Sequence, residues 1–334
     1  MTEAALQIES RPSQLYVALY DTLPHPGLGP VQEFALDVGI TATAPVVLTD
    51  VVWRAFDQND HVSFVRQRLG EAAMEELTRG QFGVAPGLGL VLPRCYFLEQ
   101  GAQPLSRLRI SVAGFEASTR VGVSASLDVP LVYPQQRAKI HLPFTNGTWW
   151  AITGNDWSSS HKAEPVSWPF AYDFVRLGPE GRTFAGDGRS NADHYSFGQP
   201  VAAPAGGKIV MVRDDMPDQA PGQPLDAGEI ADDPTRLAGN VVVIGHGYGE
   251  FSYLAHLHAG SIAVEEGQMV KRGQRIAAVG NSGHSPGPHL HYHFQEGPSL
   301  FVDRGVPVQF YRFRAVGDLV ERATIPSRMI VSPA

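Results

Sequence analysis

Residues 287–294 read Gly-Pro-His-Leu-His-Tyr-His-Phe. In an extended strand, successive side chains point to opposite faces, so His289, His291 and His293 would line one face and the large apolar residues the other. Packing gives a surface strand no reason to alternate imidazoles with large apolar side chains. Imidazole is the commonest metal-ligating side chain, and zinc sites are built from clusters of it. The stretch predicts a strand that faces a metal; the alternative is an ordinary strand whose histidines face water.

The composition indicates a globular protein with many turns. The chain has 334 residues, of which 43% are apolar, and it contains 35 glycines and 26 prolines. Such high Gly and Pro contents favour short strands over long helices. The net charge of -8 argues against non-specific binding to nucleic acid or to an anionic membrane surface. Cys95 is the single cysteine, so an internal disulfide is excluded.

The N-terminus is acidic and has no apolar run of signal-peptide length. No later segment approaches the roughly 18 uninterrupted apolar residues of a membrane-spanning helix. These features predict a soluble chain without a membrane span, and they leave the compartment and the oligomeric state open.

Residues 1–145 are expected to form one β-rich domain. Strand-like runs separated by turns suggest an antiparallel sandwich of the immunoglobulin-like kind. One helix is predicted over residues 63–79, because apolar residues recur there at helical spacing between a Ser and a Gly. Residues 146–334 are expected to form a second domain of short strands and turns.

Chemistry-bearing residues gather in the second domain. Seven of the twelve histidines lie at or after position 246. A zinc hydrolase needs three protein ligands, an open position for water, a base for that water and a donor for the oxyanion. The central strand cannot supply all of these groups, so further ligands must come from elsewhere in the chain.

Five ordered motifs carry a family resemblance. They are Gly198-x-Pro-Val-x-Ala-Pro-x-x-Gly, Gly239-Asn-x-Val-x-Ile, Tyr253-Leu-Ala-His-Leu, Gly267-Gln-x-Val-Lys-x-Gly-Gln-x-Ile and the pair Gly280-Asn-Ser-Gly with Gly287-Pro-His-Leu-His. In this order they resemble the lysostaphin/LytM-type zinc endopeptidases, which cut peptidoglycan cross-links. The resemblance covers about residues 160–300 and implies a mostly antiparallel β domain with a groove on one sheet face.

The resemblance also implies roles for individual residues. His291 matches a zinc ligand, whereas His289 and His256 match the two catalytic histidines. These two would activate the water and stabilise the tetrahedral oxyanion, with His289 taking the proton and His256 helping to hold the oxyanion. Zn²⁺ is the implied cofactor.

The remaining two ligands are harder to place. The family's usual His-x-Gly-x-Asp motif is absent here. His161 and Asp173 resemble an expanded variant and are the favoured pair, expected to bind zinc with His291. A carboxylate within the apolar strand Tyr172-Asp173-Phe174 is costly unless it is paired or metal-bound. Asp193 and His194 are the rival pair. Two insertions, over residues 176–196 and 216–237, either border the substrate site or are inert.

The leading hypothesis is therefore a zinc metalloendopeptidase that acts on peptide bonds, with peptidoglycan as the substrate and the cell envelope or exterior as the compartment if the family role holds. The alternative within the same fold is a non-catalytic member that binds cell wall or a partner protein. A third hypothesis comes from the turn around Lys271, which is similar to that of biotinyl and lipoyl carrier domains. It leaves the histidine-rich strand unexplained.

Overall fold

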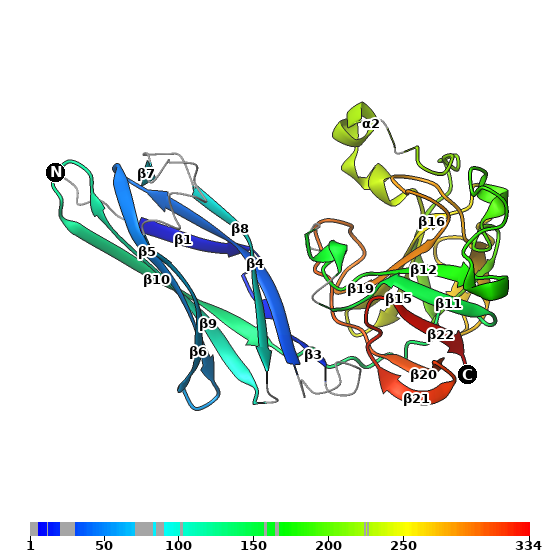
Figure 1. The fold of residues 1–334 in the computed structure, drawn as a ribbon, viewed down its shortest axis with the longest axis horizontal. Coiled ribbons are helices and arrows are strands. Elements are labelled where there is room, and N and C mark those ends of the chain that lie inside the picture. Colours follow the sequence, from blue (N-terminus) through cyan, green and yellow to red (C-terminus); the bar gives the residue numbers. More distant parts are fainter. Residues whose placement is uncertain are drawn as a thin grey trace. The chain divides into compact units, whose positions relative to one another are not determined.

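The computed structural model describes residues 6–11, 13–20, 31–70, 83–84, 90–100, 103–156, 159–163, 167–223, 225 and 227–334. The chain is mostly β, as predicted, and nearly all of its strand pairs are antiparallel (Figure 1). It divides into two compact units: the described residues up to Pro134 form the first, and Gln135–Ala334 form the second.

The first unit contains two sheets. One comprises β1 (Leu6–Arg11), β4 (Val31–Ala42), β3 (Ala18–Tyr20) and β8 (Leu90–Gln100). The other comprises β2 (Leu15–Tyr16), β10 (Gly122–Val132), β9 (Leu105–Glu116), β5 (Val46–Asp57), β6 (Val62–Gly70) and β7 (Gly83–Val84).

Both sheets of the first unit contribute to one hydrophobic core. Phe34, Leu36 and Val38 alternate along β4 and are buried together with Trp53 of β5 and Ile110 of β9. This period of two is what a strand with one buried face requires. The unit is therefore a two-layer β structure, and an immunoglobulin-like strand order stays a prediction.

The helix expected over residues 63–79 is wrong for the part that the structure describes. Residues up to Gly70 belong to β6, which pairs antiparallel with β5; residues 71–79 lie outside the described residues. Phe64 is buried between the exposed Ser63 and Val65, a strand alternation. Pairing with β5 and burial of Phe64 override the weak local preference that the helical spacing expressed.

The second unit is built on one ten-stranded sheet. Its order is β17 (Met269–Val270), β14 (Gly207–Arg213), β15 (Asn240–Gly247), β16 (Glu250–Leu257), β19 (Leu290–Gln295), β12 (Tyr172–Leu177), β11 (Thr148–Thr153), β22 (Met329–Pro333), β20 (Phe310–Ala315) and β21 (Asp318–Ala323). A small separate sheet pairs β13 (Pro200–Ala202) with β18 (Arg275–Ala278).

Short helical segments connect these strands. They are η1 (Ser160–Ala163), η2 (Pro179–Gly181), η3 (Asn191–Asp193), α2 (Ala227–Asp232) and η4 (Pro234–Ala238). The structure describes no helix that is both long and apolar enough to span a membrane.

Residues 135–145 pack within the second unit. Ile140, Leu142 and Phe144 are buried, and the Phe144 ring stacks on that of Trp149 with centroids 4.0 Å apart. The Ala202 amide donates to the Pro143 carbonyl, which ties this segment to β13. We therefore propose a domain boundary near residue 134 instead of 145.

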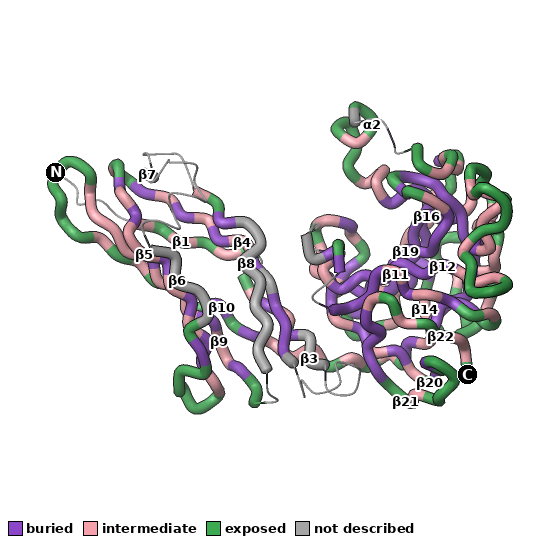
Figure 2. Tube along the Cα trace, in the orientation of Figure 1, coloured by how far each residue is buried: buried purple, intermediate pink, exposed green. Residues whose placement is uncertain are grey.

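The histidine-rich strand β19 lies between β16 and β12 (Figure 1). Its register places Asp173 of β12 and Ala255 of β16 beside His291, on either side. Directly paired residues project to the same sheet face. All three strands are largely buried (Figure 2). Because the apolar residues of β19 fill the opposite face against rings such as Phe310, the sheet holds the imidazoles and the carboxylate on one buried face.

Candidate metal centre

Three side chains from separate elements form a compact donor group. His161 of η1, Asp173 of β12 and His291 of β19 offer ligand atoms that all lie within 4.8 Å of one another. His161 Nε2 is 2.9 Å from Asp173 Oδ2, and His291 Nδ1 is 3.1 Å from Asp173 Oδ1. Two imidazoles and one carboxylate are a donor set typical of catalytic zinc sites. The residues fit a zinc ion.

The electrostatics of Asp173 keep it in the form that binds a cation. Burial opposes ionisation of this carboxyl group, but the charges of His161 and His289 and their hydrogen bonds outweigh burial and hold its pKa well below the usual range. Burial also lowers the pKa of His291 to about 4, so its imidazole is neutral, as a ligand must be.

His256 lies beside this group, where β16 departs from regular geometry. Its φ is 56°, a region that residues other than glycine rarely adopt. The pairing of β16 with β15 shifts register between Leu254 and Leu257. Such an irregularity re-aims a side chain. Here the His256 ring lies 4.7 Å from the His289 ring and 5.7 Å from that of His291, measured between centroids.

The tautomer of His256 follows from its surroundings. Its Nδ1 lies 2.8 Å from the Ser282 carbonyl, which can only accept, so Nδ1 carries the hydrogen. Burial, together with the nearby His289 and His291, holds the pKa of His256 well below its usual range. The imidazole is therefore neutral, and its Nε2 lone pair can accept a proton.

His289 is oriented in the same way but has a different electrostatic environment. Its Nδ1 donates to the Gly287 carbonyl at 2.8 Å, and its Nε2 lies 3.4 Å from Asp173 Oδ1. Burial lowers the pKa of His289, but the Asp173 carboxylate outweighs burial and raises it overall. His289 therefore holds a proton more readily than His256 does.

Trp168 is a site residue that the sequence analysis missed. Its buried ring packs 4.9 Å from the His291 ring and 5.9 Å from that of His161, between centroids. Its Nε1 has no hydrogen-bond partner among the described residues. Only its position between the two upstream ligand candidates could have pointed to it.

The rival ligand pair lies outside the donor group. Asp193 accepts from the Ser190 amide and completes a capping box at η3. His194 Nε2 lies 2.9 Å from the Gly188 carbonyl and therefore donates to it. The structure thus commits both side chains to local backbone contacts.

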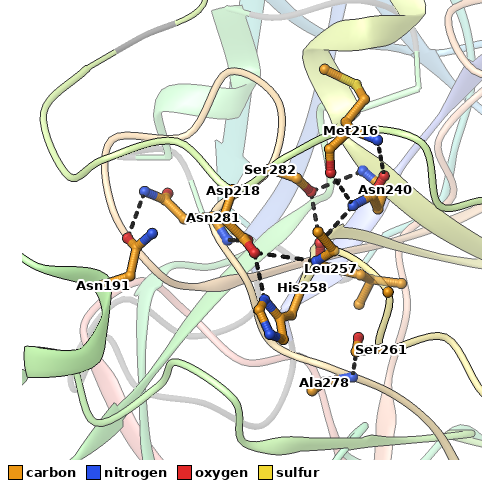
Figure 3. Close-up of polar contacts among 12 residues, drawn as sticks. Asn191, Met216, Asp218, Asn240, Leu257, His258, Ser261, Ala278, Asn281 and Ser282 are labelled. Carbon is orange, nitrogen blue, oxygen red and sulfur yellow. Dashed lines mark hydrogen bonds and ion pairs between the residues drawn. The ribbon is translucent and has the colours of Figure 1, made fainter.

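Within the insertion over residues 216–237, Asp218 makes hydrogen bonds to the segments that contain His258 and Asn281 (Figure 3). Its carboxylate pairs with His258 and accepts from the amides of Asn281, at 2.6 Å, and Ala259, at 3.2 Å. Asn281 directly precedes Ser282, whose carbonyl orients His256. The Met216 amide also donates to Asn240 Oδ1, and Asn240 Nδ2 donates back to the Met216 carbonyl. The insertion is thus structurally coupled to a catalytic candidate.

Asp218→Ala is expected to increase local opening around the amides of Ala259 and Asn281, which donate to this carboxylate. A hydrogen bond to a charged group contributes about 1.5–3 kcal/mol, which corresponds to roughly 10–100-fold faster exchange of the amides that it protects. Hydrogen exchange followed by mass spectrometry should show this increase at Ala259 and Asn281. Asp232→Ala, which removes an exposed carboxylate of α2, is the matched control. Unchanged exchange in Asp218→Ala would contradict the anchoring role.

Part of the chain around this site matches a known protein family. Residues 193–303 match the model described as "Peptidase family M23". The matched region contains His256, His289 and His291, whereas His161 and Asp173 lie upstream of it.

Two curated relatives are peptidoglycan DD-endopeptidases of Vibrio cholerae serotype O1. The chain is 47% identical over 72 residues to ShyA, covering 21% of this chain and 14% of ShyA. It is 35% identical over 96 residues to ShyB, covering 29% of this chain and 17% of ShyB. The chain thus matches about a sixth of the length of these relatives.

A solved structure with broad coverage is a zinc-containing peptidase from Vibrio cholerae. It is 15% identical to this chain, with a TM-score of 0.30, over 87% of this chain and 86% of that one. The catalytic domain of lysostaphin from Staphylococcus simulans is 18% identical, with a TM-score of 0.28, over 48% of this chain and 88% of that one.

Proposed function

We propose that this chain, which carries a peptidase family M23 domain, is a zinc-dependent endopeptidase that hydrolyses peptide bonds in bacterial peptidoglycan cross-links. The observation that carries the proposal is the buried donor group of His161, Asp173 and His291, with His256 and His289 immediately beside it. The peptidoglycan DD-endopeptidase relatives support the substrate class.

His161, Asp173 and His291 would hold the zinc ion. When bound, zinc acts as a Lewis acid and lowers the pKa of water to about 7. Three protein ligands leave a position open for water and substrate, as catalytic zinc sites do. Asp173 contributes the only negative charge of this donor set, and its burial strengthens its attraction for a cation.

The two remaining histidines would divide the proton transfers between them. Neutral His256 keeps its single N–H on the Ser282 carbonyl, so its Nε2 can accept a proton but cannot donate one. His289 likewise keeps its Nδ1–H on the Gly287 carbonyl, so the Nε2 of the neutral ring can also accept a proton. We therefore assign proton transfer to both histidines, each accepting on Nε2 when it is neutral and donating once it is protonated.

The proposal predicts a zinc requirement. Because the described residues contain a single such donor group, the purified chain should bind about one zinc ion, measured by atomic emission. A chelator such as 1,10-phenanthroline should abolish the cleavage of isolated peptidoglycan, and added Zn²⁺ should restore it. Mass spectrometry of the digests should show cross-linked dimers converted to monomers.

The outcomes separate the proposed function from its alternatives. Zinc binding and retention on peptidoglycan without loss of dimers would indicate a non-catalytic binding member of the fold. Absence of both zinc and cleavage would overturn the proposal. The carrier hypothesis is disfavoured because Lys271 lies inside the region that matches the peptidase family.

A further inference from the structure

Polar side chains continue along β19 beyond the candidate ligand. His291, His293 and Gln295 alternate on one face and are almost completely buried. His291 Nε2 lies 3.0 Å from His293 Nδ1, and His293 Nε2 lies 2.7 Å from Gln295 Oε1. Gln295 Nε2 donates to the Gly297 carbonyl at 2.6 Å. The three side chains and this carbonyl form one continuous relay.

The Gly297 carbonyl, at the end of this chain of hydrogen bonds, determines which atom donates in each of them. The Gly297 carbonyl can only accept, so the Gln295 amide must turn its NH₂ group toward it. The Gln295 Oε1 atom then faces His293 and can only accept. His293 must therefore carry its hydrogen on Nε2, which leaves a lone pair on Nδ1 when the ring is neutral.

The same constraint passes to His291. Because His293 Nδ1 accepts, His291 Nε2 must carry the hydrogen, and the Nδ1 of a neutral His291 bears the lone pair. This Nδ1 lies 3.1 Å from Asp173 Oδ1, which also bears lone pairs. Two atoms with lone pairs repel each other at this distance, and a cation bound to both removes the repulsion. The hydrogen bonds along β19 therefore favour cation binding by His291 Nδ1 and Asp173 Oδ1.

We propose that His293 and Gln295 are positioning residues that select the tautomer of His291 and direct its Nδ1 lone pair toward the metal. The inference rests on the proposed function, since it assumes that His291 is a ligand. Hydrogen bonds from outside the ligand set orient metal-binding histidines and raise their basicity. Here the orienting group is an imidazole and amide chain that ends on a backbone carbonyl.

The first test measures zinc affinity in the metal-free full chain by competition with a chromophoric chelator. His293→Leu removes the acceptor and should weaken zinc binding by about 10–100-fold. His293→Gln should stay close to wild type, because its amide can accept from His291 and donate to Gln295 in the same direction. Circular dichroism checks that each variant is folded.

The second test observes the tautomer directly and does not depend on zinc. In the metal-free wild type, the imidazole ¹⁵N spectrum of His291 should show the hydrogen on Nε2, and His293→Leu should give a mixture of tautomers. A hydrogen on Nδ1 of wild-type His291, or zinc affinity unchanged by a folded His293→Leu, would overturn the relay. Absence of zinc binding by the wild type would instead overturn the proposed function.

Discussion

Asp173→Asn is expected to abolish peptidoglycan hydrolysis by removing the anionic member of the donor group. Changes around a metal's ligands typically cost about 10–100-fold in affinity, and loss of a ligand charge should cost more. The substituted amide keeps the size of the side chain but withdraws the charge that faces His161, His289 and His291. Zinc affinity and the kcat/KM for a cross-linked muropeptide should fall together.

Asp193→Asn is the matched control for this change. It makes the same substitution at the rival ligand candidate, whose carboxylate caps η3. Zinc affinity and turnover should remain close to wild type. If Asp193→Asn loses zinc while Asp173→Asn retains it, the ligand assignment proposed for this chain is wrong.

His256→Ala and His289→Ala should each lower kcat while the chain still binds zinc. A positioned acid or base contributes about 10²–10⁴-fold to a rate, and one oxyanion donor contributes a comparable factor. Neither histidine belongs to the three-donor group, so the metal should stay in place. Single-turnover cleavage measured beside zinc content separates the loss of chemistry from the loss of metal.

His284→Ala is the control for these two variants. This histidine is exposed in the loop before the histidine-rich strand, and its backbone amide donates to the Leu237 carbonyl. Its replacement should leave kcat unchanged. Loss of zinc in His256→Ala or His289→Ala would indicate a ligand instead of a catalytic group. Full activity in both would contradict the proposed proton transfers.

The two candidate carboxylate ligands show why spacing in the sequence could not decide between them. Asp173 and Asp193 are both carboxylates at plausible distances before the Gly198 motif. The choice depends on the pairing of β12 with β19, which places Asp173 directly beside His291 although 118 positions separate them in the chain. Hydrogen bonding between distant strands is a long-range property that no local pattern expresses.

The helix expected over residues 63–79 is a second case in which a local pattern did not predict long-range strand pairing. A local apolar spacing pointed to a helix, but antiparallel pairing with β5 makes Val62–Gly70 a strand. Isolated propensities amount to less than about 1 kcal/mol per residue, so pairing and burial readily outweigh them.

The sequence by itself determined the predominance of β structure and the alternation in residues 287–294, because both depend on side chains only two positions apart. It also carried the resemblance that singles out His256, His289 and His291. Only the tertiary structure brought His161 and Asp173 to His291 and packed Trp168 against the pair of imidazoles. It also showed the hydrogen bonds that join His291 to His293 and His293 to Gln295, from which we propose that these two residues orient His291. Metal sites require atoms within a few ångströms of one another, and for Asp173 and His291 strand pairing, not chain proximity, sets that distance.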